Sequence, residues 1–290
     1  FPPLQRGRAM GLIGTSYQLG TALALSVMGY LIVGFGNSWR AAFFLPAAVF
    51  LIVAVPAALS LRSTPHRLGT HNCSVENPRV DAGSGHVSFS EILKLTLSNR
   101  RVWVLGVGLA GLNFARFGFL DWAPKFLNDV KSLEISKASL QTAVLPLGGV
   151  LGVLAAGWIS DRLFQTRRAP VISVMLACLA VLTVAFEWTV EHRGWLETVI
   201  CLSAIGCFIY GPQVMLVGTA PADLARRDLA AAAVGLVDAL AYVGAAASGF
   251  TGWLVEKYEW HLTIYTWAGV ALGAAVLTAT LWNARSQSAS

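Results

Sequence analysis

The stretch that decides the fold is residues 102–122, VWVLGVGLAGLNFARFGFLDW, in which nearly every side chain is apolar. A helix that crosses the hydrocarbon core of a bilayer needs about 20 such residues in succession. The stretch therefore predicts a membrane-spanning helix. It contains one side chain that such a helix tolerates poorly, the guanidinium of Arg116, and the amide of Asn113 lies one helical turn before it.

The composition of the whole chain agrees with a membrane protein. Of the 290 residues, 56% are hydrophobic and 12% are charged, and the mean hydropathy is +0.62, whereas soluble domains carry about 25% charged residues. The net charge of +6 belongs to loops beside apolar segments, so it does not indicate a nucleic-acid partner. The cysteines and histidines show no metal-ligand spacing, so neither a metal nor another cofactor is expected.

Eight segments are long and apolar enough to cross a bilayer, and they predict an all-α membrane protein. Glycine and proline recur within them, as they do in packed membrane helices. The predicted spans are 9–35, 41–61, 102–121, 138–160, 169–189, 197–218, 230–254 and 260–282.

The basic residues of the loops predict the orientation, because cytoplasmic loops carry an excess of Lys and Arg. With the N-terminus inside, fourteen Lys and Arg fall on inner segments and six on outer ones, which leaves Arg116 within the membrane. Both termini are then cytoplasmic. The polar stretch 63–99 is expected to be a cytoplasmic linker that ends in a short amphipathic helix, and it separates two helices in 1–62 from six in 100–290.

An internal repeat suggests that helices are missing. Residues 11–20, GLIGTSYQLG, are similar to residues 235–244, GLVDALAYVG, and a short Trp-containing loop and another span follow each. Internal repeats are typical of secondary transporters, although glycine-rich helices also match by chance. If the repeat is real, the four spans between 102 and 218 lack counterparts, which would precede residue 1. The chain is then expected to be N-terminally truncated and to hold helices 5–12 of twelve.

Two loop motifs are similar to those of the major facilitator superfamily. Residues 157–168, GWISDRLFQTRR, resemble its G-x-x-x-D-R-x-x-x-x-R-R loop, and the opening LQRGRAMG resembles E-R-G-x-A-x-G with Gln5 in place of Glu. Asp161 is placed to hold a neighbouring helix end or an arginine. The resemblance implies the major facilitator fold, with Asp161 and Arg162 in a gating loop.

Two further stretches, 116–131 and 209–225, resemble the organophosphate:phosphate antiporter branch of this superfamily. They read RFGFLDWAPKFLNDVK and IYGPQVMLVGTAPADLA. The branch includes glycerol-3-phosphate and hexose-phosphate transporters and a related sugar-phosphate sensor. The resemblance covers essentially the whole chain.

Arg116 is the principal candidate for binding substrate. A charge in the hydrocarbon core costs about 2.5–3.5 kcal/mol on insertion scales and usually faces a cavity. Snorkelling toward Asp121 is the alternative, but Asn113 on the same helical face favours a cavity-facing pair. A guanidinium fork matches the paired oxygens of a phosphate. The resemblance implies that Arg116 binds substrate phosphate together with a first-helix arginine that this chain does not contain.

Four further polar residues are predicted to line the cavity. The family's transporters often carry a histidine in the fifth helix, where this chain has Tyr17, and a tyrosine does not change its charge near pH 7. Tyr17 and Gln18 are predicted to line the substrate cavity. Tyr210 and Tyr242 lie within spans rather than at membrane interfaces, and we expect them to hydrogen-bond substrate oxygens.

Asp238 lies in mid-span, where a small residue is expected. An unpaired carboxylate there is costly. We therefore expect Asp238 to pair with Arg116, or with the missing first-helix arginine, until phosphate displaces it. Alternatively, Asp238 binds a proton and couples transport to it.

By resemblance, the expected function is exchange of an organic phosphate for inorganic phosphate by alternating access, in a monomer embedded in the inner (plasma) membrane. No nucleophile–base pair, phosphate-cradling glycine loop or ATP motif is evident, so an enzyme is not expected. Two alternatives remain open: a membrane sensor of a phosphate ester that does not transport, and a proton-coupled carrier of an organic carboxylate, since arginine also binds carboxylates.

Overall fold

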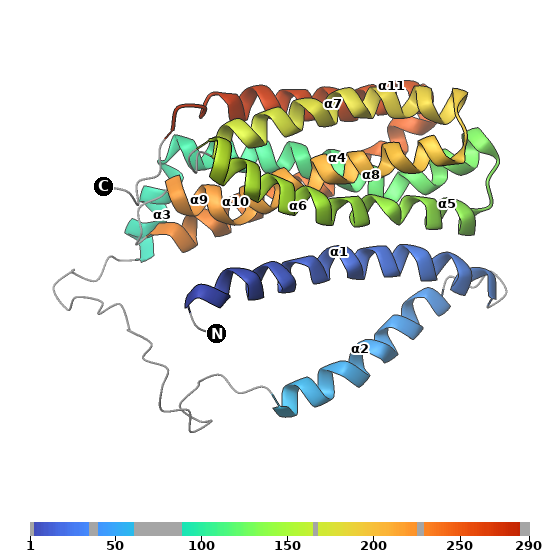
Figure 1. The fold of residues 1–290 in the computed structure, drawn as a ribbon, viewed down its shortest axis with the longest axis horizontal. Coiled ribbons are helices and arrows are strands. Elements are labelled where there is room, and N and C mark those ends of the chain that lie inside the picture. The colour runs from blue at the N-terminus through green and yellow to red at the C-terminus, as the bar shows by residue number, and fades with distance from the viewer. Residues whose placement is uncertain (1–2, 35–39, 61–88, 165–167, 225–228, 285–290) are drawn as a thin grey trace. The chain divides into compact units, whose positions relative to one another are not determined.

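The computed structural model describes residues 3–34, 40–60, 89–164, 168–224 and 229–284, and within these ranges every regular element is a helix (Figure 1). The chain divides into two compact units. One unit comprises residues 1–29 together with 92–290, and the other comprises residues 30–91. Residues 61–88, which include most of the predicted linker 63–99 and its histidines, lie outside the described residues.

Helices occur at all eight predicted positions, which confirms the all-α membrane fold. Within the described ranges, six spans are long and apolar enough to cross a membrane. The helices are α1 (Pro3–Gly34), α2 (Ala41–Ser60), α3 (Phe89–Leu97), α4 (Arg100–Lys131), α5 (Ile135–Thr142), α6 (Val144–Leu163), α7 (Arg168–His192), α8 (Trp195–Val214), the π-helix η2 (Met215–Thr219), α9 (Ala220–Leu224), α10 (Ala230–Ala247) and α11 (Phe250–Ala279).

Helix α2 belongs to the smaller unit, residues 30–91. It carries Pro46 and Pro56 within its twenty residues, and most of its described side chains are exposed. Exposed apolar side chains on a helix of this kind are the ones that contact lipid or another helix in a membrane.

The predicted span 230–254 is divided in the structure. Helix α10 ends at Ala247, and α11 begins at Phe250 after a tightened turn. Ser248 and Gly249 keep right-handed helical dihedral angles, but the amide of Gly249 donates to the Ala246 carbonyl three residues back. A change in hydrogen-bond spacing leaves no mark on hydropathy, so the sequence did not reveal it. The predicted loop before 260 is present as a break at Glu259, where φ is 63°.

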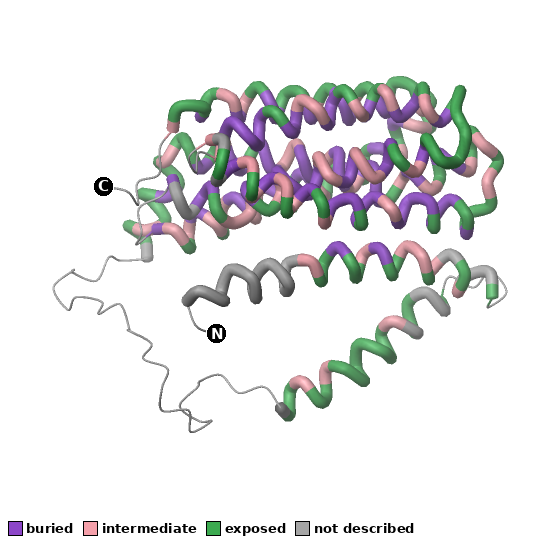
Figure 2. Tube along the Cα trace, viewed as in Figure 1, coloured by how far each residue is buried: buried purple, intermediate pink, exposed green. Residues whose placement is uncertain are grey.

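Four helix pairings form the core of the larger unit. Helix α6 packs against α8, α10 against α4, and α11 against both α7 and α4. Figure 2 shows the buried residues concentrated on the facing sides of these helices. Glycines permit the closest approaches: a Cβ on Gly148 or Gly152 of α6 would overlap the carbonyl oxygens of Ser203 or Cys207 of α8. Small residues at such contacts are typical of membrane helix packing.

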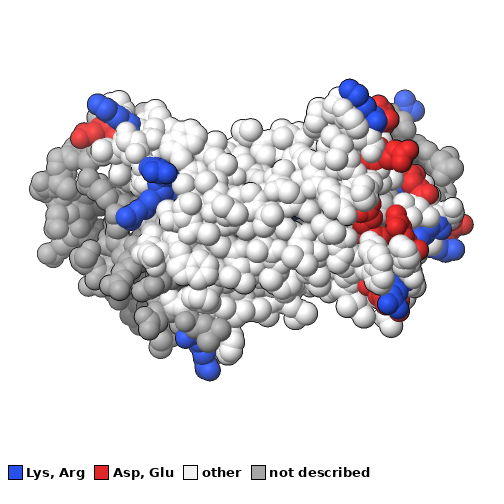
Figure 3. All heavy atoms as spheres, turned by 90° about the horizontal axis from the view of Figure 1, so that it is seen from above, with Lys and Arg blue, Asp and Glu red and all other residues white. Residues whose placement is uncertain are grey.

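Charged side chains gather at the two ends of the molecular face in Figure 3, and the surface between them shows none. An apolar belt bounded by charge is the pattern that a bilayer requires, because charged groups are costly in the hydrocarbon core.

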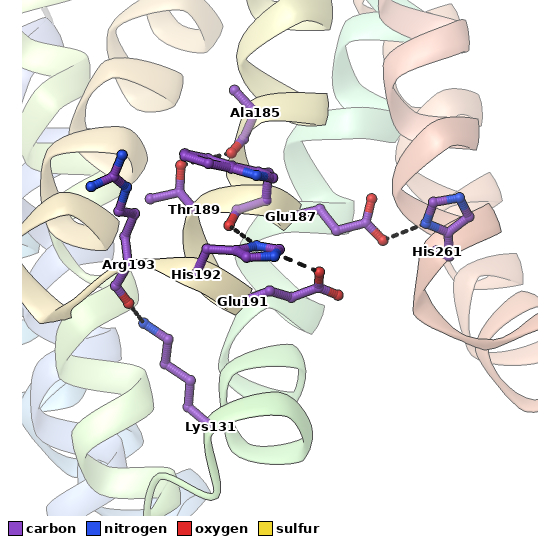
Figure 4. Close-up of polar contacts among 9 residues, drawn as sticks. Lys131, Ala185, Glu187, Thr189, Glu191, His192, Arg193 and His261 are labelled. Atoms are coloured by element: carbon purple, nitrogen blue, oxygen red, sulfur yellow. Dashed lines mark hydrogen bonds and ion pairs between the residues drawn. The ribbon is translucent and has the colours of Figure 1, made fainter.

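One end of the bundle is tied together by polar contacts between α4, α7 and α11 (Figure 4). The buried carboxylate of Glu187 on α7 accepts from Nδ1 of His261 on α11 at 2.8 Å. The Nζ atom of Lys131 donates to the carbonyl oxygen of Arg193 at 2.9 Å, and Nε1 of Trp260 donates to Asp129 at 3.0 Å. These contacts join the helices at the predicted outer surface.

Candidate functional site

A cavity of about 400 Å³ opens beside Arg116 in the larger unit. Helices α1, α4 and α10 contribute to its wall, together with the end of α8 and η2. The lining residues are Tyr17, Gln18, Asn113, Arg116, Phe117, Gln213, Val214, Val217, Gly218, Asp238 and Tyr242. Six of the nine predicted site residues therefore lie around one cavity.

Arg116 is the only Lys or Arg that is buried among the described residues, and it is 2% exposed. It lies near the middle of the 32-residue α4, about 24 Å from the start of that helix at 1.5 Å per residue. Its Nη1 atom donates to Oδ1 of Asn113 at 3.4 Å, and its Nη2 atom donates to the hydroxyl of Tyr17. The guanidinium thus faces the cavity and does not pair with Asp121.

The hydrogen-bonding capacity around Arg116 is only partly used. The Nε atom of Arg116 and the Oε1 atoms of Gln18 and Gln213 are inaccessible to solvent and have no hydrogen-bond partner among the residues that the structure describes. Buried polar groups in native structures are almost always hydrogen-bonded, so several unpaired ones around a cavity indicate a site for a polar ligand. The free Nε donor favours an anion.

Aromatic rings surround the guanidinium. The Cζ atom of Arg116 lies 5.1 Å from the ring centroid of Tyr17, 4.7 Å from that of Phe117 and 5.3 Å from that of Tyr210. Such cation–π contacts stabilise a guanidinium away from water. They offer the positive charge a favourable environment without neutralising it.

Asp238 lines the cavity but forms no ion pair with Arg116 in the described part of the chain. The predicted pairing of these two side chains is therefore absent from this structure, because Arg116 is held instead by Asn113 and Tyr17. Pairing with an arginine outside this chain, and binding of a proton, both stay predictions.

The remaining predicted tyrosines differ in position. Tyr242 lines the cavity and is 64% exposed. Tyr210 is 1% exposed and packs so closely on Gly149 of α6 that a Cβ there would overlap its ring. Tyr210 therefore lies behind Arg116 instead of lining the cavity. Gln18 and Tyr242 occupy equivalent positions of the sequence repeat, and both line the same cavity.

Sequence reasoning missed the contribution of Phe117 and of the end of α8. Gln213, Val214, Val217 and Gly218 line the cavity, and the last two lie in the π-helix η2. Single π-helical turns occur frequently at functional sites. Pro212 immediately before Gln213 was a usable signal, because proline inside a helix removes a backbone donor and disturbs regular bonding.

The predicted gating loop is only partly described. Asp161 lies in α6, but its side chain is outside the described residues. The guanidinium of Arg162 is exposed and lies 5.5 Å from the ring centroid of Trp158. A role for Asp161 and Arg162 in gating stays a prediction.

Comparisons with known proteins find relatives whose names refer to the transport of phosphate esters. The chain is 28% identical over 289 residues to the glycerol-3-phosphate transporter of Bacillus subtilis strain 168. The alignment covers 96% of this chain and 64% of that protein. It is 29% identical to a probable hexose phosphate transport protein of Chlamydia trachomatis serovar D, over 98% of this chain and 65% of that protein.

A third relative is the membrane sensor protein UhpC of Escherichia coli K12, which is 28% identical over 91% of this chain and 60% of its own length. The chain thus spans less than two thirds of the length of these curated relatives. None of the three carries the name of an enzyme.

A solved structure has the same fold: a bacterial homologue of the human lysosomal transporter Spinster in an inward-facing, unoccupied conformation. The TM-score is 0.63 at 16% identity, and the match covers 97% of this chain and 69% of that one. The sequence model of the Major Facilitator Superfamily matches residues 1–249. This match extends over most of the apolar helices and the cavity around Arg116, and the chain is therefore a multi-pass membrane protein that belongs to the major facilitator superfamily.

Proposed function

We propose that the chain forms the phosphate-binding part of a secondary transporter that exchanges an organic phosphate for inorganic phosphate by alternating access. The observation that carries the proposal is the buried guanidinium of Arg116, which lines a cavity midway along α4 and has a free Nε donor. Hydrogen bonds from a guanidinium to a phosphate are charge-assisted and can be bidentate, so they are among the strongest in proteins.

The rest of the cavity suits the organic part of a phosphate ester. Gln18, Gln213 and Asp238 supply hydrogen-bond acceptors to hydroxyl groups. The names of two of these relatives refer to glycerol 3-phosphate and hexose phosphate, which share the phosphate group and differ in the organic group. A site built around one guanidinium recognises the shared group.

The basic residues of the sequence support an orientation in which the start of α4 is cytoplasmic. Arg100 and Arg101 begin α4, and Arg162 lies near the end of the antiparallel α6, with Arg168 at the start of α7. The predicted inner segments of the whole sequence carry more Lys and Arg than the outer ones, which favours this end as the cytoplasmic one. We expect the protein to lie in the inner membrane as a monomer, with both termini on the cytoplasmic side.

A second candidate function is sensing without transport, which is favoured by the similarity to the sensor UhpC. Recognition of a phosphate ester requires the same cavity in a sensor and in a carrier, so the arrangement around Arg116 suits both. Flux across a membrane distinguishes the two functions.

The test uses proteoliposomes that contain the product of the full reading frame and are loaded with phosphate. We expect external glycerol 3-phosphate or glucose 6-phosphate to release labelled phosphate, and Arg116→Ala to abolish the release. Binding of labelled phosphate without exchange would identify a sensor. Competition by organic carboxylates as effective as that by phosphate esters would identify the carboxylate carrier and contradict the proposal.

A further inference from the structure

Access to Arg116 is controlled by the rings around it. The arginine is 2% exposed although it lines the cavity, so an anion reaches the guanidinium only when a covering group moves. Tyr210 is 1% exposed and is wedged against Gly149. Phe117 is the neighbour of Arg116 on the same helix. Tyr17 comes from another helix, α1, and its 51% exposure leaves space into which the ring can move.

The hydroxyl of Tyr17 also occupies a donor that an anion can use. A guanidinium binds two oxygens in parallel through Nε with Nη2, or through Nη1 with Nη2, and Nη2 has one N–H for each pair. In this structure Nη2 donates to Tyr17 and Nη1 donates to Asn113, while Nε has no partner among the described residues. Because the ring of Tyr17 lies over the guanidinium and Arg116 is only 2% exposed, a phosphate that forms two parallel bonds competes with Tyr17 for space as well as for this donor.

We propose that the hydroxyl of Tyr17 is a stand-in for an anion oxygen, which occupies Arg116 in the empty site and must be displaced when phosphate binds. Tyr17 thereby sets the affinity of the site. This inference rests on the proposed function, because it assumes that Arg116 binds the anion. Under this proposal, phosphate binds only after the side chain of Tyr17 on α1 has moved away from Arg116 on α4.

The chemistry of tyrosine suits such a stand-in. A neutral phenol satisfies one guanidinium donor and does not cancel its charge, whereas a carboxylate at the same place would form an ion pair that phosphate displaces only at greater cost. The ring covers the guanidinium through a cation–π contact of 5.1 Å. Binding therefore exchanges a weak neutral partner for a charged one.

The test measures equilibrium binding of ³²P-labelled inorganic phosphate to the purified full-length protein. Tyr17→Phe keeps the ring and removes only the competing hydroxyl. We expect it to tighten phosphate binding about tenfold, which corresponds to about 1.4 kcal/mol, within the range for a hydrogen bond to a charged group. Tyr30→Phe, a tyrosine of the same helix that does not line the cavity, is the matched control and should leave the affinity unchanged.

A second variant separates the ring from the hydroxyl. Tyr17→Ala removes both. We expect its association rate constant for phosphate to be higher than that of Tyr17→Phe, because no ring then covers the guanidinium of Arg116. Thermal melting in detergent checks that each variant folds.

Weaker or unchanged phosphate binding by Tyr17→Phe, in a protein whose Arg116→Ala variant has lost binding, would overturn the stand-in role and leave the proposed function intact. Tyr17 would then be a ligand of the anion or a bystander. A wild-type protein that binds no phosphate would overturn the proposed function and this inference with it.

Discussion

The side-chain amide of Asn113 forms hydrogen bonds with Arg116 on its own helix, α4, and with the backbone of a second helix, α10. Its Oδ1 atom accepts from Nη1 of Arg116 at 3.4 Å, while its Nδ2 atom donates to the carbonyl oxygen of Ala241 on α10 at 3.2 Å. The guanidinium is therefore oriented relative to both α4 and α10. Since Asp238 and Tyr242 lie on α10, the same amide helps to set the distance between the guanidinium of Arg116 and these two residues.

Asn113→Ala should weaken phosphate binding about fivefold, because one hydrogen bond that orients Arg116 contributes about 1 kcal/mol. Asn113→Asp should weaken it much further, since the new carboxylate neutralises the guanidinium. Titration of both variants with labelled phosphate checks the order. Equal affinities in the two variants would show that Asn113 does not control the charge of Arg116.

Replacing Arg116 with lysine separates charge from geometry. Arg116→Lys keeps a positive charge but loses the planar fork, so phosphate affinity should fall at least tenfold, by about 1.4 kcal/mol or more. Arg193→Lys, at an exposed position where the guanidinium stacks on Trp188, is the matched control and should bind phosphate normally. Full affinity in Arg116→Lys would mean that a point charge is sufficient.

Asp238→Asn should tighten the binding of inorganic phosphate, because it removes a negative charge from the cavity wall. It should also abolish any dependence of exchange on pH that arises from protonation of this carboxylate. Exchange is measured in proteoliposomes between pH 5.5 and 8. A variant with normal affinity and an unchanged pH profile would contradict both roles predicted for Asp238.

The contact between α10 and α4 should be sensitive to a single methyl group. A Cβ on Gly244 would overlap the carbonyl oxygen of Ala110, and the backbone cannot yield as a flexible side chain does. Gly244→Ala should therefore destabilise the protein by about 1–3 kcal/mol. Gly235→Ala on the same helix, where nothing lies within 4 Å of the added atom, is the control. Gly244→Ala should lower the melting temperature in detergent, and Gly235→Ala should not.

Most of the helices could be predicted from hydropathy, because a bilayer demands a length of apolar chain that a sequence displays directly. Arg116 was identifiable for the same reason, since a guanidinium within such a segment is an exception. Asn113, Tyr17 and Gln18 followed from their positions on helical faces or from a family resemblance. These inferences all depend on local sequence.

Features that depend on contact between helices were not predictable in this way. Phe117 and Val217 look like ordinary apolar residues of a span, and only the packing of α1, α8 and α10 around α4 makes them part of a cavity wall. Tyr210 and Tyr242 are both tyrosines within spans, yet one is buried and the other is exposed. Tyr210 can be buried because Gly149 on the partner helix α6 leaves space for its ring.

The glycine contacts between α6 and α8 have a mechanical consequence. Gly148 and Gly152 approach the backbone of α8, and a Cβ on Gly206 of α8 would in turn overlap the carbonyl oxygen of Leu145. Two helices whose main chains touch at several levels cannot slide past each other without first separating, so we expect α6 and α8 to move as one rigid body. Segments that lack such contacts can deform more readily, among them the π-helix η2, which lines the cavity.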